Sequence, residues 1–160
     1  MTVKIQLAYD KPEIITELFS EYTDMLIAGD STFAHYLSLQ NYEQEIEDLE
    51  YKYGMPDGRL YLAYYKDQVA GCIALKKFDE NRCEMKRLYV KPEFRGLSIG
   101  GLLVEKIIAD AKDIGYKKML LDTLPFLKSA IKMYKGYGFY EITQYLESPM
   151  SDAIYMQLDL

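Results

Sequence analysis

A glycine-rich segment, residues 95–101, separates a stretch that alternates like a β-strand from a stretch with helical periodicity. It consists of Arg95, Gly96, Leu97, Ser98, Ile99, Gly100 and Gly101. The first turn of a helix offers unpaired N–H groups and partial positive charge, and residues without a β-carbon let an anion approach the backbone. The segment therefore predicts a loop that binds pyrophosphate, with Arg95 as a permanent cation and Lys86, Arg87 and Lys91 nearby.

Two other kinds of phosphate-binding loop do not fit this segment. The dinucleotide fingerprint G-x-G-x-x-G fails because Ser98 and the pair Gly100-Gly101 are out of phase with it. A nucleoside triphosphate loop needs Gly-Lys-Ser or Gly-Lys-Thr, and the sequence contains neither. Taken alone, the glycines are also compatible with a turn that binds nothing.

Hydrophobic periodicity and turn residues place this loop within an ordered series of elements. We expect strands at 3–8, 60–65, 69–78, 82–90, 117–123, 139–144 and 153–160, and helices at 11–29, 41–54, 102–115 and 124–138. Turns at 66–68 and 79–81 would join three strands into an antiparallel meander. The predicted fold class is α/β of the α+β kind, a mixed, mostly antiparallel central sheet of about six to seven strands flanked by helices. Because no repeat or linker divides the chain, we expect residues 1–160 to form a single domain.

Composition argues against several kinds of site. The sequence has no apolar run of the about 20 residues that a membrane span needs, and its N-terminus lacks the features of a secretory signal. We therefore expect a cytoplasmic protein that does not enter a membrane. Cys72 and Cys83 are expected to be reduced core residues, and the single histidine, His35, to be structural or exposed, so no metal site is expected.

Charge is distributed unevenly along the chain, whose formal net charge is −6. Residues 1–58 carry three lysines against twelve carboxylates, whereas the remainder carries sixteen basic against thirteen acidic residues. An acidic surface repels nucleic acid, so no nucleic acid partner is expected, and it would attract a cationic partner. The same residues also suit a solvated acidic helix face, and the sequence alone does not decide between these two interpretations.

Two blocks of sequence are more specific together than the loop alone. In residues 85–123, Arg95 to Gly100 follow the pattern Arg/Gln-x-x-Gly-x-Gly/Ala, except that Ser98 stands at a position that is usually glycine. The second block is Ala-x-x-x-Tyr-x-x-x-Gly-Phe, formed by Ala130, Tyr134, Gly138 and Phe139. In these blocks, which span roughly the C-terminal half to three fifths of the chain, the sequence resembles the GNAT superfamily of N-acetyltransferases. Leu127 departs from the asparagine that many members carry there.

The resemblance implies an N-acetyltransferase that moves the acetyl group of acetyl-CoA to a primary amine, by direct attack through a tetrahedral intermediate. The acceptor would be a small molecule or a peptide, no metal would be needed, and a homodimer is compatible with such a family. Backbone N–H groups of Leu88, Tyr89 and Val90, on a strand opened by a bulge, would meet the pantetheine arm and the oxyanion. Ala130 would leave room for the cofactor one helical turn from Tyr134, which would protonate the leaving thiolate.

The resemblance also implies a role for Glu84, because several members place a carboxylate at this point of the sheet. It would take a proton, directly or through water, from an acceptor amine whose reference pKa lies near ~10.4. The alternative is a strand-surface glutamate that pairs with Arg82, Lys86 or Arg87. We expect the neighbouring Tyr137 and Tyr140 to be structural, because they lie outside the motif.

Two further functions fit the same loop. One is a catalytically silent acyl-CoA-binding sensor or partner-binding module, and the other is a nucleotide-binding domain. The acceptor site carries no motif that we can interpret. The acidic first third of the chain suggests that Glu43, Glu45 and Glu47 contact an acceptor amine.

Overall fold

The computed structural model describes residues 2–160, and a seven-stranded sheet forms its centre. The sheet has the strand order β1-β2-β3-β4-β5-β7-β6. Its strands are β1 (Val3–Leu7), β2 (Arg59–Tyr65), β3 (Gln68–Lys77), β4 (Arg82–Val90), β5 (Lys118–Thr123), β6 (Tyr140–Ile142) and β7 (Ile154–Asp159). Every adjacent pair is antiparallel except β4 and β5, which run parallel. This arrangement confirms the predicted fold class and the predicted meander of β2, β3 and β4.

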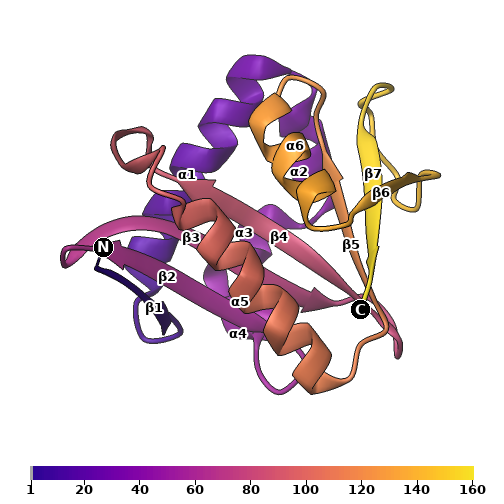
Figure 1. The fold of residues 1–160 in the computed structure, drawn as a ribbon. Coiled ribbons are helices and arrows are strands. Elements are labelled where there is room, and N and C mark those ends of the chain that lie inside the picture. Colours follow the sequence, from indigo (N-terminus) through magenta and orange to yellow (C-terminus); the bar gives the residue numbers. More distant parts are fainter. Residues whose placement is uncertain (1) are drawn as a thin grey trace.

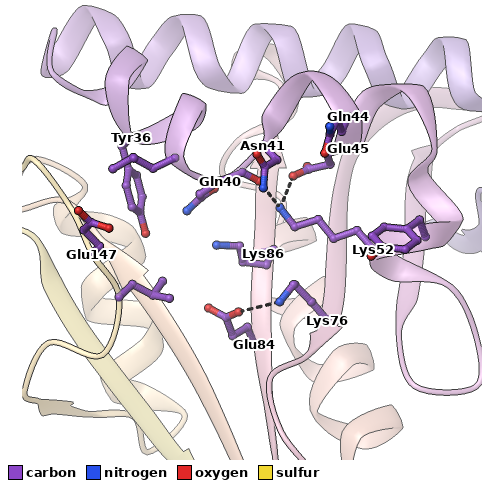
Figure 2. A pocket seen from close by; sticks show the side chains of 13 residues that line it. Tyr36, Gln40, Asn41, Gln44, Glu45, Lys52, Lys76, Glu84, Lys86 and Glu147 are labelled. Carbon is purple, nitrogen blue, oxygen red and sulfur yellow. Dashed lines mark hydrogen bonds and ion pairs between the residues drawn. The ribbon is translucent and has the colours of Figure 1, made fainter.

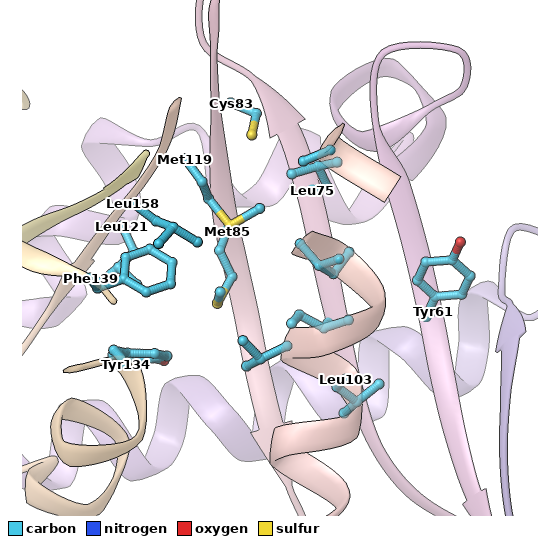
Figure 3. Packing of buried hydrophobic residues seen from close by; sticks show 14 of the residues in the cluster. Tyr61, Leu75, Cys83, Met85, Leu103, Met119, Leu121, Tyr134, Phe139 and Leu158 are labelled. Atoms are coloured by element: carbon cyan, nitrogen blue, oxygen red, sulfur yellow. The ribbon is translucent and has the colours of Figure 1, made fainter. Parts of the chain in front are cut away.

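Helices cover both faces of the sheet (Figure 1). They are α1 (Pro12–Gly29), α2 (Phe33–Leu39), α3 (Tyr42–Glu47), α4 (Leu49–Tyr53), α5 (Ile99–Ile114) and α6 (Lys128–Gly136), with a single helical turn, η1 (Pro92–Phe94), after β4. Helix α5 crosses one face of β2–β4, and α1 lies behind the opposite face. Helix α6 contributes Tyr134 to the same buried cluster as Leu103 of α5 and Leu121 of β5 (Figure 3).

The central strands are apolar on both sides because both of their faces are buried. On β2, Tyr61 and Ala63 belong to the cluster under α5, whereas Leu60 and Leu62 pack in the cluster that contains Phe19 of α1. Successive side chains on a strand point to opposite faces, so two buried faces require an uninterrupted apolar run. This explains why β2 reads as continuous hydrophobic sequence.

Helix α5 begins earlier than its periodicity indicates. It starts at Ile99 rather than at residue 102, so the last three residues of the glycine-rich segment form its first turn. It ends before Gly115, whose φ of 109° is the left-handed conformation that commonly closes a helix. The predicted position of the loop, between a strand and a helix, is confirmed.

Two expectations about helices were wrong in detail, and one helix was missed. The expected helix at 41–54 is two helices, α3 and α4, because Asp48 leaves the helical conformation and caps α4 by accepting a hydrogen bond from the Tyr51 N–H at 3.2 Å. Helix α2 was not expected from its seven residues. Helix α6 is shorter than expected because residues 124–127 form a turn, closed by the Leu127 N–H bonding the Leu124 carbonyl at 3.0 Å.

Candidate active site

The two parallel strands at the centre of the sheet separate after a short paired stretch. Strands β4 and β5 pair only where Arg82 to Glu84 face Lys118 to Leu120. Beyond Leu120, β5 continues its pairing with β7 alone, up to Thr123. The second half of β4 therefore has one edge without a neighbouring strand.

A bulge in β4 lies at the start of this free edge. Cys72 faces Tyr89 and Ala74 faces Lys86, so Arg87 and Leu88 stand opposite one residue of β3. Arg87 adopts a φ of 58°, in the left-handed region. The bulge expected in 88–90 is thus present, and its irregular residue is Arg87.

The bulge determines which backbone groups face the gap between β4 and β5. The Lys91 N–H donates to the carbonyl of Ala70 in β3 at 2.8 Å. Because successive N–H groups of a strand point to opposite sides, those of Leu88 and Val90 turn away from β3 and toward the gap. The Tyr89 N–H turns toward β3, so only two of the three predicted backbone donors face the gap.

The glycine-rich loop presents its backbone rather than its side chains. Gly96 and Ser98 have φ values of 82° and 63°, and Ser98 precedes the first turn of α5. The φ of Ser98 is in the region that glycine occupies at least cost, so the serine carries strain that the usual glycine would avoid. Leu97 and Ile99 pack against the core and anchor the loop, whereas Gly96 and Ser98 are exposed.

Two further loop positions lie close to β4 and α6. A β-carbon on Gly101 would lie 3.1 Å from the Tyr137 hydroxyl, and that hydroxyl donates a hydrogen bond to the Gly101 carbonyl at 3.2 Å. A β-carbon on Gly100 would lie 3.8 Å from a methyl group of Val90. The first turn of α5 is therefore packed closely against β4 and α6.

Among the basic residues predicted near phosphate, only Arg95 belongs to the loop. Its guanidinium is exposed, donates to the Val90 carbonyl at 3.1 Å and lies 5.9 Å from the centre of the Tyr89 ring. Lys91 pairs with Glu21 of α1 at 3.4 Å. Lys86 and Arg87 point into the molecule on the side of α2–α4, so the expectation that they assist the loop was wrong.

Tyr134 lies at the end of the gap between β4 and β5. Its ring is 7% exposed and packs against Phe139 at a centroid distance of 5.7 Å (Figure 3). It lines a small cavity of about 40 Å³ together with Leu88 and Asp122. Burial raises the pKa of Tyr134 and keeps its hydroxyl protonated. Ala130, one turn earlier on α6, is half-buried and packs on the same core.

Glu84 lines a different cavity. It is 2% exposed, and its carboxylate accepts a hydrogen bond from the Tyr145 hydroxyl at 3.0 Å. The Lys76 ammonium is 3.6 Å from its other oxygen. The partners considered from the sequence, Arg82, Lys86 and Arg87, were therefore wrong. Lys76 stands directly opposite Glu84 in the β3–β4 ladder, so the register of the hairpin is the signal that could have identified it.

The two cavities that contain the candidate catalytic residues share part of their walls. The larger cavity has a volume of about 490 Å³. Glu84 lines the larger cavity and Tyr134 the smaller one, and Tyr36, Gln40 and Lys86 line both. The Tyr36 hydroxyl donates to Asp122 at 2.8 Å, and the Lys86 ammonium is 3.7 Å from the same carboxylate. Burial and the Asp122 charge raise the pKa of Tyr36. The sequence analysis missed Tyr36, Gln40 and Asp122, which come from segments far apart in the chain.

A buried ion network fixes helices α3 and α4 to the bulge. Arg87 donates to both carboxylate oxygens of Glu45 at 2.9 Å, and Lys52 contacts one of them at 2.6 Å. Burial alone would raise the pKa of Glu45, but the charges and hydrogen bonds of Arg87 and Lys52 lower it to about 2. Glu45 is therefore held in a buried ion network at the wall of the larger cavity, and its contact with an acceptor amine stays a prediction.

The remaining sequence-based candidates lie outside these cavities. Cys72 and Cys83 are buried free thiols, and His35 is exposed on α2. Residues 2–160 bring together no group of three or more His, Cys, Asp or Glu side chains arranged to hold a metal ion. Within the described part of the chain, the helices are too short or too polar to cross a membrane.

Comparisons with known proteins identify the family of this chain. The model of the acetyltransferase (GNAT) family matches residues 16–139. An uncharacterized N-acetyltransferase of Dictyostelium discoideum is 35% identical and is covered, like this chain, over 100% of its length. Another from Schizosaccharomyces pombe is 41% identical over 78% of this chain and 77% of its own.

A solved structure shows the same fold at low sequence identity. The PaiA N-acetyltransferase of Thermoplasma acidophilum, solved in complex with coenzyme A, superposes with a TM-score of 0.78 at 21% identity over 100% of both chains. The family match and the two relatives carry the assignment by sequence, and this structure shows the same fold. The chain belongs to the GNAT family of N-acetyltransferases.

Proposed function

We propose that this chain transfers an acetyl group from acetyl-CoA to a primary amine, with residues 1–160 acting as one domain. The observation that carries the proposal is the gap between β4 and β5, into which the N–H groups of Leu88 and Val90 turn. An extended pantetheine arm would bond to this edge as an additional strand does. A donor N–H at the edge would also stabilise the oxyanion that forms during acyl transfer.

The glycine-rich loop would hold the pyrophosphate of the donor. Its N–H groups stand at the first turn of α5, where the helix carries partial positive charge, and Arg95 adds a full charge beside them. The contributing residues would be Arg95, Gly96, Leu97, Ser98, Ile99, Gly100 and Gly101. The pantetheine would continue past Val90, Tyr89 and Leu88, with Ala130 leaving space beside it.

The reaction would take place where the two cavities meet. An amine that enters through the larger cavity would lose a proton to Glu84, through water, because Glu84 does not line the smaller cavity. The free amine would attack the thioester carbonyl, and the C–S bond would break as the tetrahedral intermediate collapses. Tyr134, kept protonated by burial, would give its proton to the departing thiolate.

The experiment that tests this proposal measures CoA thiol release from acetyl-CoA with a panel of primary amines, and identifies each product by mass. Turnover of at least one amine, with a mass increase of one acetyl group, is the expected result. If CoA binds but no amine is acetylated, the chain is a silent acyl-CoA-binding module. If ATP displaces bound CoA at equal concentration, the loop belongs to a nucleotide-binding domain.

A further inference from the structure

The larger cavity has an unusual lining for a site that must accept an amine. Figure 2 shows its walls, formed by α2, by α3 and α4, by β3 and β4, and by the segment that contains Glu147. Lys52, Lys76 and Lys86 come from three of these elements and turn their ammonium groups into the same space (Figure 2). A cationic acceptor bound here alone would meet three like charges.

The three lysines differ in how completely they are paired. Lys52 is 2.6 Å from Glu45, which is a short, charge-assisted hydrogen bond. The Lys76 ammonium is 3.6 Å from Glu84 and 3.4 Å from the Lys77 carbonyl, and the Lys86 ammonium is 3.7 Å from Asp122. Ammonium donors bind oxygen best at about 2.7–2.9 Å, so Lys76 and Lys86 retain donor capacity.

Of these two residues, Lys86 has the greater need for a further hydrogen-bond acceptor, because its side chain is only 6% exposed. A buried ammonium that lacks close oxygen partners carries a desolvation cost. An oxygen of a ligand placed between Lys86 and Lys76 would reduce that cost. Both ammonium groups line the same cavity, so one ligand group can reach both.

The charges in and around the cavity do not cancel. Arg87 and Lys52 share the single carboxylate of Glu45, whereas Lys76 faces Glu84 and Lys86 faces Asp122. Four cations therefore stand against three carboxylates, and the remaining acid of the lining, Glu147, is exposed at the rim. One negative charge on a ligand would complete the balance.

We propose that the acceptor is a primary amine that also carries a carboxylate, as an amino acid does, with the carboxylate bound by Lys76 and Lys86. The amine would then point toward the smaller cavity, which shares Tyr36, Gln40 and Lys86 with the larger one. A volume of about 490 Å³ is large enough to admit an amino acid. A carboxylate fits better than a phosphate, which carries about −1.5 to −2 charges at neutral pH.

This inference rests on the proposed function and is tested with matched acceptors. An α-amino acid is compared with its own carboxamide, which keeps the amine and removes the negative charge, and with an aminoalkyl phosphate. We expect the wild-type protein to acetylate the amino acid with a kcat/KM about tenfold above that of the amide. The phosphate-bearing amine should rank below the amino acid.

Lys76→Met tests the assigned anion contact, and Lys77→Met is its matched control. The two lysines are neighbours on β3, so their side chains point to opposite faces of the sheet, and Lys77 pairs with Glu80 at 2.9 Å. Lys76→Met should raise the KM for the amino acid about tenfold, leave the KM for the amide nearly unchanged and thereby abolish the preference. Lys77→Met should retain it.

Each other outcome overturns a defined part of the account. Equal kcat/KM for acid and amide, or equal effects of the two variants, would overturn the carboxylate site and leave the acetyltransferase intact. Preference for the phosphate would overturn the carboxylate assignment. If no amine is acetylated, the proposed function fails, and calorimetric titration of the protein–CoA complex with the amino acid decides the site: binding weakened by Lys76→Met supports it, and absence of binding overturns it.

Discussion

The two sides of β4 would bind their substrates with different parts of the chain. On the proposed donor side, which comprises Leu88 to Val90, Arg95 to Gly101 and Tyr134, the binding groups would be mainly backbone N–H groups. On the proposed acceptor side, they would be charged side chains of α3, α4, β3 and β4, which line the larger cavity. Backbone recognition constrains φ and demands glycine, whereas side-chain recognition constrains charge and pairing. Substitutions on the two sides should therefore impair the protein in different ways.

The largest effect is expected where the acceptor side is tied to the bulge. Glu45→Gln would leave Arg87 buried without its carboxylate, and breaking a buried ion pair typically costs about 3–5 kcal/mol. Urea unfolding should show a loss of this size. Glu43→Gln, an exposed change in the same helix, should alter the free energy of unfolding by less than about 0.5 kcal/mol. Equal effects would show that the network does not stabilise the fold.

Acid should weaken the same network. The pKa of Glu45 is about 2 in the folded protein, below its ordinary value of 4.5, so the unfolded chain binds a proton more readily. The stability that Glu45 contributes is present above about pH 4.5 and is lost as the pH falls toward about 2. Unfolding free energies measured across this range should fall less steeply for Glu45→Gln than for the wild type. Parallel curves would contradict the ion pair.

On the donor side, a substitution that changes the backbone preference should weaken CoA binding and leave acceptor binding unchanged. Gly96 has a φ of 82°, and no atom lies within 4 Å of an added β-carbon, so Gly96→Ala acts through strain alone. Left-handed strain of about 1 kcal/mol corresponds to about fivefold weaker CoA binding if the loop shifts to relieve it. Calorimetry should show this loss while the KM of the acceptor stays constant. Unchanged CoA affinity would show that the loop does not contribute to donor binding.

The smallest effect is expected at the serine that departs from the family pattern. Ser98 holds a φ of 63° without capping α5 through its side chain. Ser98→Gly should raise the free energy of unfolding by about 0.5–1 kcal/mol and leave CoA affinity equal or higher. A thermal melt and a CoA titration measure both quantities. A loss of stability would mean that the serine hydroxyl makes a contact that compensates for the strain.

The sequence predicted the donor side better than the acceptor side for a physical reason. Strand β4 was expected at its observed bounds and α5 to within one residue of its observed end, because alternation and Gly115 are local signals. The loop was recognisable for the same reason, since its special φ values require glycine within a few residues. Periodicity could not show the φ of Ser98, because a serine leaves no signal of its backbone angle.

The acceptor side depends on contacts between distant segments. Glu45 reads as one acid among many until Arg87, 42 residues away, is brought beside it. Helix α2 was missed because its seven residues are held by tertiary contacts such as the bond from Tyr36 to Asp122, 86 residues away. Lys76 and Glu84 are the exception, because the register of one hairpin places them opposite each other.

The most direct test of the central claim compares Tyr134→Phe with Tyr140→Phe in acetyl transfer. Tyr134 lines the cavity beside the gap, whereas Tyr140 is exposed on β6 and bonds to Asp159 at 2.8 Å. If Tyr134 protonates the thiolate, its loss should lower kcat about 100-fold or more with the CoA dissociation constant nearly unchanged, and Tyr140→Phe should keep the wild-type rate. A Tyr134→Phe variant that turns over as fast as the wild type would contradict the account.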